Sequence, residues 1–407
     1  MPPKNWSRFL SGLLVIYGLW LVDSAWNPAW SETTDTTFSS LDYLSNTERS
    51  LMKGLDAVLH GDLTGALREL TVLTRQRPDF RLAQLVQGDV YMAMAGGLHG
   101  FGNGQGNDPE VQHLQEEARA RLRNLLDPPP KDAIPQDLIY LSRAQGHAAV
   151  VDLTKSRLFL FRRINGRPEL IANYYISSGK NGAGKFLKGD KRTPIGLYFI
   201  TDYLPGYKLP PLYGVGAMPI NYPNEWDRLH RKTGDGIWLH GTPFTTYSRP
   251  PTTSDGCVAL TNIDFQTIGE VVGIGTPVII SNAVEWLDPV EWRGQLDWFL
   301  ARVQEWHQDW VSGRADRVLR HYSSGFQNNR YDYASWSRAL HRFFQEKGAG
   351  ETSFSDMSIL GYPTDRRMIV VTFTQEMRGK ELSRQPLRRQ YWWLENDLWK
   401  IVYEDTG

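Results

Sequence analysis

Apolar residues recur at intervals of three and four along residues 41–97, the spacing that places them on one face of an α-helix. The pair Gly61 and Asp62 separates two of these helical runs, and Pro78 separates the next two. A further helix is expected over 110–126, directly before a run of prolines that would end it. The pattern therefore predicts several short helices joined by tight turns.

The Gly-Asp turn and the positions of Ala66, Leu67 and Leu70 resemble tetratricopeptide units. An independent solenoid needs about three stacked repeats, and this stretch has room for about one and a half. We therefore expect plain helical hairpins over 41–146 that pack on the next part of the chain. The Gly-rich stretch 96–110 matches no phosphate-binding fingerprint and is expected to be a flexible connection.

Beyond residue 146 the period of the apolar residues changes from helix-like to strand-like. Asn-Gly and Thr-Lys-Ser sequences mark turns, and Gly- and Pro-rich connections separate the later strands. Short strands with such punctuation predict a β sandwich or barrel over 147–282. The predicted strands lie within 147–166, 169–179, 196–204, 236–241 and 276–282.

A third pattern begins near residue 288. Two amphipathic helices broken at Ser312 and Gly313 and a third helix over 333–348 precede three strand-like runs. Helices followed by antiparallel strands predict an α+β domain over 288–407. This region contains Trp306, Trp310, Tyr322, Phe326 and Trp336 in its helical part and a closing hairpin over 395–405. With these features it resembles the cone-shaped nuclear-transport-factor-like fold, and a hypothesis is that its Trp-rich concavity positions glycan or docks a partner.

The N-terminus has the layout of an export signal. Lys4 and Arg8 precede an uncharged, mostly apolar run over 9–22, which is shorter than a preferred membrane-spanning helix. We expect residues 1–30 to be either a cleaved signal peptide or a retained N-terminal anchor, and membrane contact to occur only through that anchor. The 45 basic residues balance 45 acidic ones, so the charge gives no reason to expect a nucleic-acid partner.

Cys257 is the only cysteine, which excludes an intrachain disulfide and a multi-cysteine zinc site. A thiol needs a base to become a nucleophile at neutral pH. His240 ends a predicted strand 17 positions earlier, so the two side chains can face each other across adjacent strands. The carbonyl of Gly241 is free to orient the imidazole, and Gly256 lets backbone amides approach a developing oxyanion. No cofactor and no metal is implied.

The sequence from His240-Gly241 to Ser254-x-Gly256-Cys257-Val258 resembles the signature of the L,D-transpeptidase catalytic domain. The segments 150–161, 189–200 with its Thr-Pro-x-Gly sequence, and 220–230 resemble that domain's opening hairpin, second motif and substrate loop. The resemblance implies that Cys257 is the acyl-forming nucleophile and His240 its base. It also implies that the Gly241 carbonyl orients the base, and that the amides of Gly256 and Cys257 bind the oxyanion.

The substrate implied by the resemblance is the tetrapeptide stem of peptidoglycan, cut at the L,D bond before the terminal D-Ala. We expect a periplasmic enzyme of cell-wall remodelling and cell shape, either an L,D-transpeptidase or an L,D-carboxypeptidase. Cell-wall or envelope proteins are expected partners through the helical and C-terminal domains. The fold class is a multidomain α+β chain: N-terminal helical hairpins, a central mainly-β L,D-transpeptidase-like sandwich, and a C-terminal α+β cone-shaped domain.

Two positions depart from that family. Many members have His where this chain has Asp255, and Arg where it has Ala259. The form "GCVAL" looks more like a subgroup with the cone-shaped C-terminal domain, several of whose members are L,D-carboxypeptidases. The alternative that these departures favour is a non-catalytic cell-wall binding scaffold.

Other residues near the motif are expected to contact substrate or solvent. Asp227 and His230 are expected on the loop surface. The expected substrate-binding residues are Tyr222, Trp238, Arg192, Ser254 and Asp255.

Overall fold

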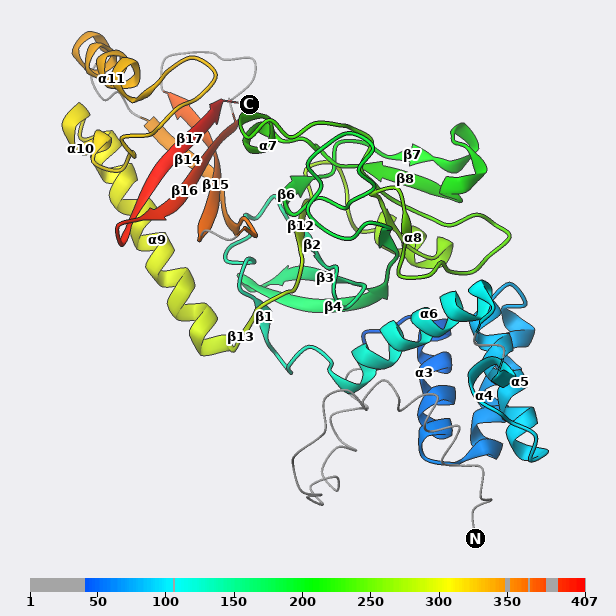
Figure 1. Cartoon of the computed structure of the whole chain (residues 1–407). Helices are drawn as coiled ribbons and strands as arrows, with labels where there is room; N and C mark the ends of the chain where they lie inside the picture. The colour runs from blue at the N-terminus through cyan, green and yellow to red at the C-terminus, as the bar shows by residue number, and fades with distance from the viewer. Residues whose placement is uncertain (1–40, 105–106, 348–351, 365–366, 378–386, 407) are drawn as a thin grey trace.

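The computed structural model describes residues 41–104, 107–347, 352–364, 367–377 and 387–406 (Figure 1). The expected signal or anchor over 1–30 lies outside these residues. Within the described ranges, no helix is both long enough and apolar enough to cross a bilayer.

The N-terminal region is helical, as predicted. Its apolar faces pack into one cluster that includes Leu51, Leu70 and Val86. Asp62 caps the second helix by accepting a hydrogen bond from the Gly65 amide at 2.8 Å, which explains the chain reversal at the Gly-Asp turn. The helices are α3 (Asn46–Leu59), α4 (Leu63–Gln76), α5 (Arg81–Met94) and α6 (Pro109–Leu126).

The Gly-rich stretch between α5 and α6 is not simply a flexible connection. It contains the short helix η1 (Phe101–Gly104), with the Phe101 side chain buried. The Asp89 carboxylate accepts hydrogen bonds from the amides of Gly102 at 2.8 Å and Asn103 at 3.1 Å. The prediction was wrong for this part because a buried acceptor on α5 holds the loop, and sequence spacing does not show that contact.

A buried ionic cluster joins the helical region to the central sheet. Glu48 on α3 accepts hydrogen bonds from Arg121 Nε at 2.9 Å and from Arg157 Nη2 at 3.0 Å. Glu117 pairs with the same Arg121 at 2.6 Å, and the Arg121 guanidinium lies 3.7 Å from the ring centre of Tyr175. Both guanidinium groups are fully buried, so losing one acid would leave a buried charge without its partner.

The centre of the molecule is built from two β sheets, consistent with the predicted sandwich. The strand order in the larger sheet is β4-β3-β2-β12-β6 and in the smaller β11-β9-β8-β7. Buried side chains such as Leu160, Ile280, Leu239 and Val258 fill the space between them. The larger sheet holds β2 (His147–Asp152), β3 (Arg157–Ile164), β4 (Arg167–Tyr175), β6 (Gly196–Phe199) and β12 (Pro277–Ser281), and the smaller holds β7 (Leu204–Pro205), β8 (Gly216–Pro219), β9 (Trp238–His240) and β11 (Val258–Ala259).

Short elements complete this region. A parallel pair and an antiparallel pair of two-residue to three-residue strands lie outside the two sheets. These are β5 (Ser178–Gly179) with β10 (Thr252–Ser254), and β1 (Ile134–Pro135) with β13 (Trp286–Leu287); the helices are α7 (Glu225–Leu229), α8 (Asn262–Gly269), η2 (Gly206–Lys208) and η3 (Pro211–Tyr213).

The C-terminal part is the predicted α+β unit, with one strand that the sequence pattern did not reveal. That strand, β14, contains a register shift between Ser355 and Ser358 and a positive φ at Asp356, so its apolar alternation is interrupted. The four strands form one antiparallel sheet in chain order. The elements are α9 (Pro289–Val311), α10 (Ala315–Leu319), α11 (Tyr333–Lys347), β14 (Thr352–Gly361), β15 (Met368–Met377), β16 (Leu387–Glu395) and β17 (Leu398–Thr406).

Four of the aromatic residues that carry the resemblance to the cone-shaped fold lie in the C-terminal core. Trp306 and Trp310 are 2% and 3% exposed, and their ring centres are 5.8 Å apart. Tyr322 and Phe326 are equally buried, with ring centres 5.0 Å apart. These four rings therefore pack against other side chains of the hydrophobic core.

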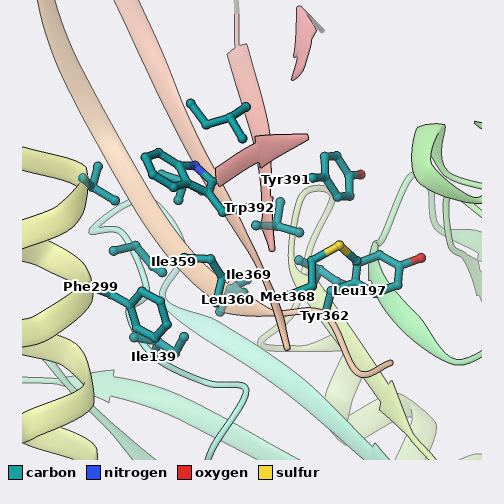
Figure 2. Close-up of a cluster of buried hydrophobic side chains, with 14 of the residues drawn as sticks. Ile139, Leu197, Phe299, Ile359, Leu360, Tyr362, Met368, Ile369, Tyr391 and Trp392 are labelled. Atoms are coloured by element: carbon teal, nitrogen blue, oxygen red, sulfur yellow. The ribbon is translucent and has the colours of Figure 1, made fainter. Parts of the chain in front are cut away.

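The central and C-terminal parts share one hydrophobic cluster. Figure 2 shows Leu197 of the larger sheet and Ile139 of the preceding segment among side chains from α9 and the C-terminal strands. Tyr362 and Tyr391 belong to the same cluster. The outer face of the larger sheet is thus covered by the C-terminal part, whereas the inner face packs on the smaller sheet.

Candidate active site

Strand pairing brings Cys257 and His240 to one face of the smaller sheet. β11 runs parallel to β9, with Val258 opposite Leu239 and Ala259 opposite His240. Extending this register by one residue places Cys257 beside Trp238. Residues two apart on a strand point to the same side, so Cys257 and His240 are diagonal neighbours. The thiol is half-buried and the imidazole is 2% exposed.

The imidazole of His240 is held in one tautomer. Its Nδ1 lies 2.6 Å from the carbonyl oxygen of Gly241, and because a carbonyl only accepts, Nδ1 carries the proton. Burial lowers the pKa of His240 to about 4, against the opposing effect of that hydrogen bond. The ring is therefore neutral at pH 7, with a lone pair on Nε2.

Asn262, at the start of α8, holds the His-Gly segment in place. Its Oδ1 accepts hydrogen bonds from the amides of Val215 and Thr242, both at 3.1 Å, and its Nδ2 donates to the Thr242 carbonyl at 2.8 Å. A Cβ on Gly241 would lie 2.2 Å from this Oδ1, so only glycine fits there. The glycine beside the base thus allows a close approach by a second loop.

The thiol of Cys257 is protonated in its resting environment. Sγ donates to the carbonyl of Gly236 at 3.3 Å. Burial raises the pKa of the thiol, and Asp255 adds to this, whereas the Trp238 amide and the positive charge of Arg249 lower it. The site therefore pairs a neutral thiol with a neutral imidazole rather than a preformed thiolate and imidazolium.

The backbone before the thiol is fixed by side chains. Gly256 has a φ of 129°, and a Cβ there would lie 2.8 Å from the carbonyl oxygen of Arg192. Its amide donates to Ser254 Oγ at 3.1 Å, and that hydroxyl donates to the Cys257 carbonyl at 2.6 Å. Ser254 is 3% exposed, so it shapes the loop rather than presenting a hydroxyl to a substrate.

Thr193 connects the Thr-Pro-x-Gly sequence to the same loop. Its Oγ1 accepts a hydrogen bond from the Gly179 amide at 2.8 Å and donates to the Gly256 carbonyl at 3.0 Å. The residue has no exposed surface. The Thr-Pro-x-Gly sequence does not by itself predict this role of the threonine, because the contact joins residues 63 positions apart.

The structure places Tyr222, one of the expected substrate-binding residues, in the core, and it places Arg192 at the surface. Tyr222 is 5% exposed and lies within the core, with its hydroxyl donating to the Thr233 carbonyl at 3.2 Å. Arg192 is exposed, and its guanidinium donates to the Ala183 carbonyl at 2.9 Å. Tyr222 therefore supports the segment around Thr233 from the core and has no ring surface available to a substrate.

Trp238 and Asp255 lie at the surface of the site. Trp238 is half-buried, with its ring 4.9 Å from that of Tyr213. Asp255 is exposed, and its carboxylate pairs with Lys180 Nζ at 2.8 Å. This ion pair directs the carboxylate charge toward a lysine, and the contact with Lys180 lowers the pKa of Asp255.

Arg249 is a residue near the thiol that sequence reasoning missed. It is partly buried, and its Nη2 donates to the Thr253 carbonyl at 2.7 Å. Its charge acts on both Cys257 and Asp255. The chain lacks an arginine at Ala259, but it has a guanidinium nearby from the loop that leads to the cysteine.

Asp227 contradicts the expectation of a loop-surface carboxylate, whereas His230 is exposed as expected. Asp227 has no exposed surface and pairs with Lys232 at 2.7 Å. It is turned inward because Asn224 caps α7 through a capping box that folds this residue back. Among the described residues, no three His, Cys, Asp or Glu side chains are grouped so as to hold a metal ion.

This fold and site define a chain with an L,D-transpeptidase catalytic domain and a C-terminal NTF2-like domain. Residues 146–280 match the L,D-transpeptidase catalytic domain model, and residues 298–405 match the Cds6 C-terminal NTF2-like domain model. The first match implies peptidoglycan as the substrate class and a place in the cell envelope. No curated protein sequence matches the chain.

Two solved structures resemble most of the chain. Bd1075 of Bdellovibrio bacteriovorus is 25% identical, with a TM-score of 0.59, over 68% of this chain and 99% of that one. The helical cell shape determining protein Pgp2 of Campylobacter jejuni is 22% identical, with a TM-score of 0.56, over 66% of this chain and 96% of that one. Nearly the whole length of each of these two proteins therefore shares the fold of this chain.

Proposed function

We propose that the chain is a cysteine-dependent enzyme that cuts the L,D bond before the terminal D-Ala of peptidoglycan tetrapeptide stems. The observation that carries the proposal is the pair Cys257 and His240, on one face of adjacent strands within the matched catalytic domain. The Gly241 carbonyl fixes the imidazole so that Nε2 is its basic nitrogen. A half-buried thiol beside such a base is the arrangement needed for acyl transfer.

The reaction begins with both groups neutral. Nε2 of His240 takes the thiol proton as Cys257 Sγ attacks the carbonyl carbon of the third stem residue. The carbon–nitrogen bond then breaks, and the departing D-Ala amine receives the proton from His240. A thioester on Cys257 remains. Because burial disfavours both charged forms, proton transfer is expected to accompany attack rather than precede it.

The oxyanion of this step needs backbone donors. The family resemblance implies the amides of Gly256 and Cys257, and in the structure the Gly256 amide donates to Ser254 Oγ. We therefore assign the Cys257 amide as the donor that binds the oxyanion of the substrate. The positive φ of Gly256 and the Thr193 hydrogen bond maintain the loop in the shape that presents it.

The thioester has two fates. Water as the acceptor releases a tripeptide, which is carboxypeptidase activity, and an amine of a second stem gives a crosslink, which is transpeptidase activity. In either case His240 removes a proton from the acceptor and returns it to the thiolate of Cys257.

A non-catalytic scaffold remains the alternative because Asp255 and Ala259 depart from the family pattern. Two contacts argue for catalysis instead. The Asp255 carboxylate is ion-paired with Lys180 at the surface, and Arg249 places positive charge near the thiol. Arg249 lowers the cost of forming a thiolate, and the ion pair with Lys180 offsets part of the opposing charge of Asp255.

The proposal also covers the cellular location of the protein and the boundaries of its domains. We propose a periplasmic protein exported by residues 1–30, which act as a signal peptide or anchor. The helical region spans 41–146, the catalytic domain 147–282, and the C-terminal domain 288–407. The helical and C-terminal domains are proposed to bind cell-wall or envelope partners, and the similarity to a cell shape determining protein supports a role in cell shape.

The test is turnover of purified disaccharide-tetrapeptide, followed by mass spectrometry, with Cys257→Ala as the control. Loss of D-Ala that depends on Cys257 supports the proposal, and the product distinguishes hydrolysis from crosslinking. An unchanged tetrapeptide in both samples, with the stem still bound, would instead favour the scaffold.

A further inference from the structure

The helix α7 lies against the C-terminal sheet (Figure 1). Trp226 of α7 stacks on Tyr391 of β16, with ring centres 5.6 Å apart and planes 15° apart, and meets the edge of Trp393 at 6.1 Å. α7 belongs to the segment 220–236 that precedes β9 and the catalytic pair. The C-terminal domain therefore contacts a segment that leads directly into the active site.

A hydroxyl from the C-terminal domain enters the buried side of this segment. Tyr362, directly after β14, is 2% exposed, and Figure 2 shows it close to Leu197 and Met368. Its hydroxyl donates to Asp227 Oδ1 at 3.1 Å and accepts from Asn224 Nδ2 at 3.2 Å. This hydroxyl is thus bonded to both residues that form the capping box of α7.

The same hydroxyl lies against the Thr-Pro-x-Gly sequence. A Cβ on Gly196 would lie 2.7 Å from the Tyr362 oxygen and 2.8 Å from the Tyr198 oxygen. Tyr198 in turn donates to Asp227 Oδ2 at 3.1 Å. Glycine at the end of that motif is therefore needed here to admit two tyrosine hydroxyls to one buried carboxylate.

From Asp227 the contacts continue to the thiol. Lys232 Nζ pairs with Asp227 Oδ1 at 2.7 Å, which holds the chain just after α7. Tyr222 then bonds the Thr233 carbonyl, and three residues later the Gly236 carbonyl accepts the hydrogen bond of the Cys257 thiol. A shift of α7 would be passed along this short segment to the acceptor beside Sγ.

We propose that Tyr362 is a positioning residue of the active site: through Asp227 and Asn224 it fixes the segment 220–236 against the catalytic pair. The inference rests on the proposed function, because it assigns Tyr362 a part in that same reaction. The C-terminal domain accordingly contributes to catalysis by ordering the wall of the site, in addition to any binding role of its own.

The test compares Tyr362→Phe, which deletes only the hydroxyl, with Tyr391→Phe in the same interface. Tyr391 packs through its ring on Trp226 and Tyr362, so deleting its hydroxyl keeps these ring contacts and leaves the hydrogen bonds from Tyr198, Tyr362 and Lys232 to Asp227 in place. The full-length proteins are measured by steady-state turnover of disaccharide-tetrapeptide, by amide hydrogen exchange resolved to peptides, and by thermal unfolding.

For Tyr362→Phe we expect kcat to fall about tenfold with little change in KM, because misplacement of reacting groups slows the chemical step. We also expect exchange over 220–236 to accelerate while exchange in the sheets stays unchanged. Tyr391→Phe is expected to match the wild type in both. Wild-type kinetics and exchange in Tyr362→Phe would overturn the proposal, and so would a rise in exchange spread over the whole C-terminal domain. If the wild type does not turn over tetrapeptide, the proposed function fails, and the exchange pattern alone then decides whether Tyr362 orders this segment.

Discussion

The substitution Thr193→Val tests how the cysteine loop is held. Valine has the shape of threonine without its hydroxyl, so it deletes the hydrogen bonds to the Gly179 amide at 2.8 Å and to the Gly256 carbonyl at 3.0 Å. Both backbone groups belong to buried residues. Two hydrogen bonds at about 1 kcal/mol each, together with the cost of the unpaired groups, predict a loss of about 2–3 kcal/mol.

Thermal unfolding of the purified protein measures this loss, which corresponds to a fall in Tm of about 4–10 °C. Because the Gly256 carbonyl adjoins Cys257, the rate of acylation of the thiol should fall in the same variant. Thr201→Val is the control, since Thr201 is exposed and its hydroxyl donates to the Pro219 carbonyl at 3.2 Å. If Thr193→Val unfolded and acylated like this control, the loop would not depend on the hydroxyl and the reasoning would be refuted.

Three further predictions concern charge. The pKa of His240 is about 4 in the folded protein against a usual 6.5, so the unfolded state takes up a proton more readily than the folded state. The free energy of unfolding is therefore unaffected above pH 6.5 and falls by about 3 kcal/mol as the pH drops to 4. Melting curves taken across this range should show the loss in the wild type and not in His240→Gln. Glu48→Gln leaves the buried Arg157 guanidinium without a charged partner and Arg121 with Glu117 alone, and it should cost about 3–5 kcal/mol. Glu116→Gln, on the exposed face of the neighbouring helix, should change Tm little, and equal Tm values for the two variants would contradict the importance of the buried cluster. Asp255→Asn should lower the pKa of Cys257 and speed its alkylation by iodoacetamide at pH 7, because Asp255 raises that pKa; slower alkylation would contradict the electrostatic account.

Much of the fold could be predicted from periodicity and turn residues. The helices from α3 to α6 and the strands on either side of the Asn-Gly turn at Asn165 follow local patterns that tertiary contacts do not alter. Strand β14 was not predicted, because the bulge around Asp356 interrupts the alternation of its side chains. A prediction that depends on strict alternation of apolar and polar residues misses a strand in which a bulge reverses the alternation partway along.

The proposed catalytic pair could be predicted from the sequence because its members lie within one short motif. The residues that support it could not. Three supporting residues come from separate parts of the chain: Thr193, Arg249 and Asn262. Each acts through contacts with backbone groups or through its charge, which sequence spacing does not reveal.

Asp227 shows the limit most clearly. A lone carboxylate in a loop rich in Pro and Asn is usually solvated, and the sequence analysis expected it at the surface. The capping box of α7 turns it inward, and Tyr362, 135 positions away in a different domain, is one of its hydrogen-bond donors. Only the folded structure shows that the C-terminal domain supplies this donor.

The most direct test of the central claim is detection of the covalent intermediate. The protein would be mixed with disaccharide-tetrapeptide, quenched in acid, digested, and analysed by mass spectrometry for the peptide that contains Cys257. The account predicts a thioester adduct on this peptide equal to the stem without its terminal D-Ala, and no adduct in Cys257→Ala. Release of D-Ala by Cys257→Ala at the wild-type rate, or binding of the stem with neither adduct nor D-Ala release in the wild type, would contradict the assignment of Cys257 as the nucleophile.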